Sequence, residues 1–153
     1  MVLWNMPQRV GDRARMAFIL RESRLAWEAF DRELRERGEG PVDGGWTASI
    51  VYAHVARWLE RADERLQRHI EGSPDGAPEN PVAEDALNQR WATEDVSLAL
   101  EQARGRCEAA FERLHARLAE LDPMEWDETV LQMAEDDALD HLRSHLHSMG
   151  VEA

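Results

Sequence analysis

Four stretches of this chain place apolar residues three and four positions apart, and this spacing constrains the fold more than any other feature. Such a pattern puts the apolar side chains on one face of a helix. The predicted helices run from about Asp12 to Arg37, from the N-cap Thr47 to about His69, from Thr93 to about Glu120, and from about Val130 to Met149. We find no convincing two-residue alternation typical of a strand. The pattern predicts an all-α protein.

Glycine and proline interrupt the helical pattern in two main places. The segment 37–45 separates the first two helices, and a longer connection runs from Glu71 to about Ala92, with a short helical turn expected around Glu84 to Trp91. Long connections in helical bundles usually serve as crossovers that set neighbouring helices parallel. We therefore expect a four-helix bundle in up-down-down-up order with a long connection between the second and third helices. Residues 1–153 suit a single domain.

The charge balance excludes several classes of partner. The chain has 31 acidic and 18 basic residues, for a net charge of -13. A negative surface repels phosphate backbones and anionic lipids, so we expect neither nucleic-acid nor membrane binding. No apolar run approaches membrane-spanning length and no signal-peptide pattern opens the sequence, which favours a cytoplasmic location. The single cysteine, Cys107, lies on an apolar stripe and is interpreted as a small buried residue.

Three of the six histidines are positioned to meet. His141 and His145 are four residues apart and therefore stack on one helical face, as a metal-binding pair requires. His54 lies on the inward face of the second helix, about 10 Å beyond its start, while the pair lies about 6 to 12 Å before the end of the fourth helix. Antiparallel packing of these helices brings all three to one level, although a lone inward histidine is also often a hydrogen-bonded core residue. The other histidines are interpreted as solvated or helix-terminal: His69, His115 and His147.

Three short motifs, in this order, carry a family resemblance. They are Gly45-Trp46-Thr47 through His54, then Asp85-Ala86-Leu87-Asn88, then Asp140-His141-Leu142-Arg143-Ser144-His145. Over nearly its whole length the chain resembles the DinB-like or YfiT-like bundles, which include the N-terminal domain of mycothiol-dependent maleylpyruvate isomerase and the ClbS-type proteins. The resemblance implies an up-down-down-up bundle, a homodimer, and a metal held by His54, His141 and His145. Exposed tryptophans, expected at Trp4 and Trp126, would also favour a dimer.

Two functions remain open from the sequence. In the first, an enzyme, three neutral imidazoles hold zinc or nickel with an open position, which activates water or a low-molecular-weight thiol against an electrophilic small molecule. Trp58, Asn88 and Trp91 are the expected substrate-binding residues, and they equally suit ordinary core and loop packing. In the second, a metal-free protein binds or sequesters a small molecule in a cavity between its helices.

Overall fold

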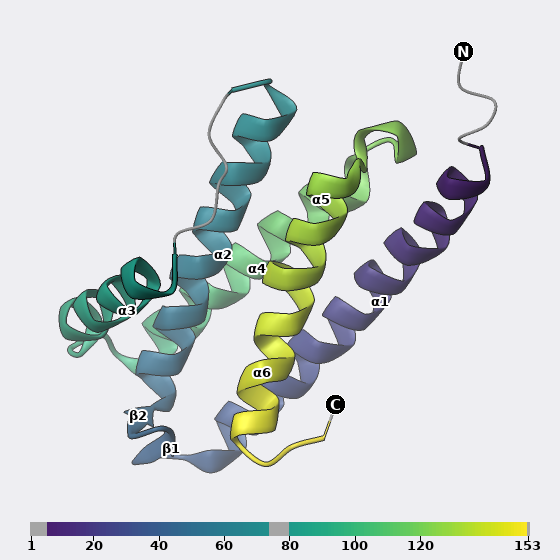
Figure 1. Ribbon diagram of the computed structural model, residues 1–153. Helices are drawn as coiled ribbons and strands as arrows, with labels where there is room; N and C mark the ends of the chain where they lie inside the picture. Colours follow the sequence, from purple (N-terminus) through teal and green to yellow (C-terminus); the bar gives the residue numbers. More distant parts are fainter. Residues whose placement is uncertain (1–5, 74–79, 153) are drawn as a thin grey trace.

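The computed structural model describes residues 6–73 and 80–152, and most of these residues are helical (Figure 1). The helices are α1 (Met6–Arg37), α2 (Ala48–Ile70), α3 (Pro81–Asp95), α4 (Leu100–Glu120), α5 (Glu128–Met133) and α6 (His141–Ser148). A π-helical segment, Ala134–Asp140, joins α5 to α6, and a 3₁₀ turn, Pro123–Glu125, precedes α5. The prediction of an all-α protein is confirmed.

Helix α2 begins where the sequence predicted. The hydroxyl of Thr47 accepts a hydrogen bond from the backbone N–H of Ile50 at 3.4 Å, which satisfies one of the free donors at the helix start. This cap sets the register of α2, and the register decides which face carries His54.

A short hairpin between α1 and α2 departs from the expectation that strands are absent. Its strands are β1 (Pro41–Asp43) and β2 (Trp46–Thr47), and they pair antiparallel. Gly44 and Gly45 between them have φ angles of 56° and 90°, which glycine adopts without steric cost and which match the twist of a tight hairpin. Strands of two and three residues are too short to show an alternating pattern. The hairpin places Asp43 beside the end of α6.

The long connection after α2 contains a complete helix, so two predicted boundaries are wrong. Helix α3 has 15 residues where only a short turn was expected, and α4 starts at Leu100 rather than Thr93. The side chain of Asn80 caps α3 by accepting a hydrogen bond from the backbone N–H of Ala83 at 2.9 Å. Within α3 only Trp91 and Asp95 are buried, so no broad apolar stripe revealed the helix in the sequence. In Figure 1, α3 lies on the outer side of α2.

The core lies between α1, α2, α4 and the α5–α6 segment. Its largest fully buried side chains come from all four: Ile19, Phe30, Leu34, Tyr52, Leu59, Leu66, Phe111, Leu114, Leu118, Leu131, Leu139 and Leu142. Cys107 is buried in this core as predicted, and burial raises the pKa of its thiol well above the ordinary value. A buried thiol of this kind is unreactive.

Trp126 contradicts one expectation about the surface. Its side chain is only 2 % exposed, and its indole N–H donates a hydrogen bond to the carbonyl oxygen of Leu118 at 3.1 Å. Trp126 therefore packs within the chain and offers nothing to a dimer contact, and Trp4 lies outside the described residues. Among the described helices, none is both long and apolar enough to cross a membrane.

Candidate metal centre

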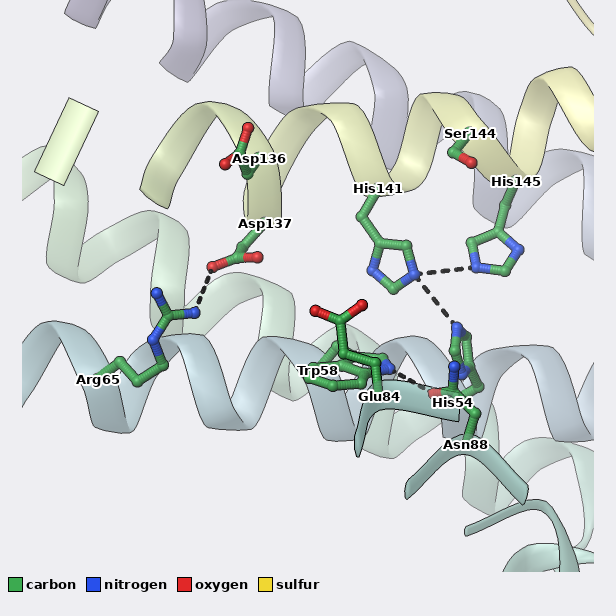
Figure 2. Close-up of a pocket in the computed structure, with 10 residues that line it drawn as sticks. All are labelled: His54, Trp58, Arg65, Glu84, Asn88, Asp136, Asp137, His141, Ser144 and His145. Atoms are coloured by element: carbon green, nitrogen blue, oxygen red, sulfur yellow. Dashed lines mark hydrogen bonds and ion pairs between the residues drawn. The ribbon is translucent and has the colours of Figure 1, made fainter. Parts of the chain in front are cut away.

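The structure brings the imidazoles of His54, His141 and His145 together. His54 comes from α2, and the other two come from successive turns of α6 (Figure 2). The Nε2 atom of His141 lies 3.2 Å from Nε2 of His54 and 3.1 Å from Nε2 of His145. One nitrogen from each ring lies within 4.8 Å of the other two, so the group could hold a metal ion.

Hydrogen bonds between the three rings cannot satisfy this arrangement. A ring nitrogen carries either one N–H or one lone pair in the ring plane. Nε2 of His141 faces two other Nε2 atoms. Its single N–H or single lone pair would therefore have to form hydrogen bonds with both neighbours at once. At least one of the two contacts is poorly satisfied in every neutral tautomer, whereas a cation placed among three lone pairs satisfies all of them.

The spacing of the nitrogens also suits a tetrahedral transition-metal ion. Zinc binds imidazole nitrogen at about 2.0 to 2.1 Å, which separates two ligand nitrogens by about 3.3 Å in tetrahedral geometry. The two Nε2 contacts of 3.1 and 3.2 Å are close to that separation. Imidazole favours zinc, nickel, copper or iron over magnesium and calcium, which prefer oxygen ligands.

Burial keeps two of the imidazoles in the form that binds metal. Burial and the neighbouring His145 lower the pKa of His54 to about 3, and burial holds the pKa of His141 well below its ordinary value. Both rings are therefore neutral near pH 7. Neutral imidazole has the free lone pair that metal coordination requires.

A carboxylate orients one of the three rings. Nδ1 of His145 donates a hydrogen bond to Asp43 of β1 at 2.7 Å, and the hydroxyl of Ser148 donates to the other oxygen of that carboxylate. Burial acts to raise the pKa of Asp43, but the hydrogen bonds from Ser148 and His145 hold it below the ordinary value, so Asp43 is ionised. An ionised carboxylate only accepts hydrogen bonds, so the proton of a neutral His145 sits on Nδ1 and leaves Nε2 free for a metal.

His54 lacks such support. Its Nδ1 is buried and has no hydrogen-bond partner among the described residues. The ring instead packs against Trp46, with the ring centroids 4.9 Å apart. On the Nδ1 side, aromatic packing rather than a hydrogen bond therefore supports this imidazole.

A pocket of about 410 Å³ opens beside the three histidines. Its walls come from α2, α3 and the π-helical segment with α6, and its lining consists of His54, Trp58, Arg65, Glu84, Asn88, Asp136, Asp137, His141, Ser144 and His145. Figure 2 shows the histidines at one end, the Arg65–Asp137 pair at the other, and the carboxylate of Glu84 between them. The pocket thus joins an end lined by the three histidines to a charged end.

Two of the three residues predicted to contact a substrate line this pocket. Trp58 and Asn88 do so, and the indole N–H of Trp58 donates to Oδ1 of Asn88 at 2.8 Å. Trp91 does not line the pocket but packs edge-on against Trp58, with the ring centroids 5.0 Å apart. Its position supports the pocket wall from behind.

The other histidines lie elsewhere. His69 is 2.7 Å from a carboxylate oxygen of Asp127 near the end of α2, and Nε2 of His115 donates to the carbonyl oxygen of Leu20 at 2.9 Å. His147 is exposed on α6. None of the three lines the pocket. His69 and His147 agree with the prediction of helix-terminal or solvated histidines, whereas the half-buried His115 does not.

Sequence reasoning missed five charged residues of the site: Asp43, Arg65, Glu84, Asp136 and Asp137. A signal existed for Asp137, because it lies four residues before His141 and therefore one helical turn away. Asp43 and Glu84 lay in segments expected to be connections, so no periodicity pointed to them.

Comparison with known proteins gives one match. The family model described as DinB superfamily matches residues 17–149, a span that includes all three histidines and every residue that lines the pocket. No curated protein and no solved structure matches the chain.

Proposed function

Since the chain belongs to the DinB superfamily, we propose that it is a metal-dependent enzyme that uses His54, His141 and His145 to activate water or a low-molecular-weight thiol against an electrophilic small molecule. The reaction is then a hydrolysis or a thiol transfer. Zinc or nickel is the proposed metal.

One observation carries this proposal: three imidazole nitrogens converge where their own hydrogen bonds cannot satisfy them. When bound there, a divalent ion lowers the pKa of a water or thiol ligand and so supplies a nucleophile near neutral pH. Three protein ligands, rather than four, are typical of catalytic rather than structural zinc sites.

The chain's own residues supply orientation and enclosure. Asp43 holds His145 in the tautomer whose Nε2 faces the other ligands. The pocket volume of about 410 Å³ lies within the range of about 300 to 1,000 Å³ that small-molecule sites occupy. Trp58 and Asn88 bond to each other and form a fixed wall against which a small molecule can pack.

Metal analysis of protein purified without a polyhistidine tag tests the proposal. We expect near-stoichiometric zinc or nickel in the wild type, loss of that metal in His141→Ala, and retention in the control His115→Ala. Circular dichroism of both variants checks that the helices persist. A metal-free wild type that also fails to bind added zinc or nickel in calorimetry would favour the alternative, a metal-free binding or sequestering protein.

We also propose that the four long helical segments form a bundle in up-down-down-up order. Figure 1 supports this arrangement, since the start of α2 and the end of α6 lie at the same end of the molecule. His54 lies beside His145, and Arg65, further along α2, lies 3.3 Å from Asp137, which comes earlier in the chain than His145. This reversed order of contacts supports opposite directions for α2 and the segment that ends in α6. The crossover that contains α3 provides the length that this order needs.

Three further sequence predictions stay proposals: a single domain over residues 1–153, a homodimer and a cytoplasmic location. Light scattering at micromolar concentration tests the dimer, for which a mass near twice 17.5 kDa is expected.

A further inference from the structure

Asp137 lies in the pocket but outside the histidine group. It belongs to the π-helical segment Ala134–Asp140, one turn before His141. In this segment the backbone N–H of His141 bonds to the carbonyl oxygen of Asp136, five residues back. Wide turns of this kind are rare and frequently occur at functional sites. Here the π turn carries two consecutive carboxylates, Asp136 and Asp137, into the lining of the pocket.

The surroundings of Asp137 combine one cation with two anions. Arg65 of α2 lies 3.3 Å from Oδ2 of Asp137, while Glu84 of α3 and Asp136 of the same segment bring negative charge to it. Figure 2 shows the carboxylates of Glu84 and Asp137 on the same side of His141, both directed into the pocket. The Asp137 side chain is 27 % exposed, so a bound molecule can reach it.

This environment favours the protonated carboxyl. Burial raises the pKa of Asp137 to about 6, Asp136 and Glu84 act in the same direction, and Arg65 offsets only part of the rise. A group that gains and loses a proton near the working pH is suited to general acid–base catalysis.

Asp31, an acidic residue of the core, has a full set of hydrogen-bond donors around its carboxylate, unlike Asp137. Both carboxylate oxygens accept hydrogen bonds from Arg104, at 2.8 and 3.0 Å, and Oδ1 also accepts one from Tyr52 at 2.7 Å. Burial acts to raise the pKa of Asp31, yet these hydrogen bonds bring it below the ordinary value. Asp137 has one longer contact with Arg65 and remains open to the pocket, which is not the pattern of a carboxylate that serves stability.

We propose that Asp137 is the proton donor and acceptor of this pocket and that Arg65 is its positioning residue. The inference rests on the proposed function. As the nucleophile bonds to the electrophilic centre, the bond to the leaving group breaks, the leaving group keeps the electron pair, and it takes the proton of Asp137. The carboxylate then takes up the proton that the nucleophile releases, so charge and atoms balance without an oxidant or reductant. The substrate class is therefore an electrophile whose leaving group needs a proton, such as an alkyl ester or an amide.

Carboxyl titration by NMR, with ¹³C-labelled aspartate, tests where the proton sits. In zinc-free protein we expect one resonance to titrate near pH 6, to disappear in Asp137→Asn and to remain in the control Asp85→Asn, an exposed residue of α3. Arg65→Gln should raise the midpoint further because the lowering effect of the guanidinium is gone. A midpoint of Asp137 near pH 4, the ordinary value of an aspartate, would overturn the proposal.

Zinc loading separates this inference from the proposed function. A cation held by the histidines favours the charged carboxylate, so zinc should lower the midpoint of Asp137 by at least half a pH unit. Calorimetry above pH 7 should give Asp137→Asn a zinc affinity only about threefold weaker than that of the wild type, the factor that a half-unit shift implies by linkage, since Asp137 is not a ligand. Zinc that binds without moving the midpoint overturns this inference alone. A wild type that binds neither zinc nor nickel, with a carboxyl that still titrates near pH 6, overturns the proposed function instead.

Ester hydrolysis by zinc-loaded protein tests whether Asp137 donates a proton or acts only as a nearby charge. Phenolate, the leaving group of phenyl acetate, is more basic than 4-nitrophenolate, so hydrolysis of phenyl acetate depends more on a proton donor than hydrolysis of 4-nitrophenyl acetate does. Loss of a general acid commonly costs about 10² to 10⁴ in rate. We expect Asp137→Asn to lower phenyl acetate hydrolysis at least tenfold more than 4-nitrophenyl acetate hydrolysis. Equal losses for the two esters contradict the proposal.

Discussion

Helix α2 packs against α4 on one side and against the π-helical segment with α6 on another. The polar groups of α2 differ between the two sides in how well their hydrogen bonds are satisfied. Toward α4, Arg106 donates to both oxygens of Glu60 at 2.9 and 2.6 Å. Toward α6, Nε2 of His54 meets Nε2 of His141 at 3.2 Å, and Nδ1 of His54 has no partner within the described part of the chain. The hydrogen bonds of Glu60 and Arg106 in the first interface are satisfied, whereas the ring nitrogens of the histidines in the second are not.

This difference separates stability from function. Buried polar groups are normally hydrogen-bonded, because an unsatisfied group costs free energy on folding. An interface selected only for stability would not bring three imidazole nitrogens together, depress two histidine pKa values and raise that of Asp137. The α2–α6 side therefore carries the candidate site, while the α2–α4 side forms the scaffold.

The largest effect is expected from a cavity on the scaffold side. Leu114 of α4 is only 2 % exposed in the core. Leu114→Ala should lower the free energy of unfolding by about 2 to 5 kcal/mol, because it removes buried methyl groups and leaves a void. Urea denaturation measures the loss. The zinc affinity of the folded variant should not change, and a large fall would show that the two sides of α2 are not separable.

Zinc bound by the three histidines on the α6 side should increase the free energy of unfolding. At free zinc about 100 times its dissociation constant, the ligand stabilises the folded state by about 2.7 kcal/mol. Urea denaturation of wild type with and without zinc measures this gain. His141→Ala should show none of it, whereas His115→Ala should match the wild type.

Asp43→Asn tests the orientation of His145. Loss of a carboxylate that orders a ligating histidine typically weakens metal binding by about 10- to 100-fold. Isothermal titration calorimetry with zinc measures the change, and Glu39→Gln, an exposed residue in the same connection, is the matched control. Unchanged affinity in Asp43→Asn would mean that helix packing alone orients the ring.

The free energy of unfolding of the zinc-free protein should decrease as the pH is lowered, because of His54. Its pKa is about 3 when folded, against 6.5 for an ordinary histidine, so below pH 6.5 the unfolded chain binds a proton that the folded chain does not. Stability is therefore present above pH 6.5 and is lost as the pH falls toward 3, at up to about 1.4 kcal/mol per pH unit. Urea denaturation in a chelator at pH 6.5 and 5.5 should show a smaller loss in His54→Gln than in the wild type. The exposed variant His147→Gln should behave like the wild type.

The smallest effect is expected from an ion pair on the scaffold side. Glu60 is 29 % exposed and Arg106 is 37 % exposed, so solvent screens their attraction. Glu60→Gln should cost up to about 1 kcal/mol in urea denaturation. Glu64→Gln, at an exposed position of α2, is its control. A loss well above that range would mean that the ion pairs, and not the apolar core, dominate this interface.

Much of the fold was predictable because helical periodicity is a local signal. The cap at Thr47 and the inward face of α2 follow from neighbouring residues, as does the stacking of His141 with His145. Helix α3 was missed because only Trp91 and Asp95 of it are buried, and contacts with α2 hold it: Trp91 packs on Trp58, and Arg57 bonds to Asp95 at 2.7 and 2.8 Å. A helix with so few buried residues has little apolar periodicity from which to predict it.

The sequence by itself therefore determined an all-helical chain and three histidines on inward faces, because both follow from residues a few positions apart. Only the tertiary structure decided what surrounds the histidines. Asp43 reaches His145 across 102 residues of chain, and Arg65 reaches Asp137 across 72. Such pairings depend on how whole helices and a glycine turn pack, and no local pattern encodes which side chains then meet.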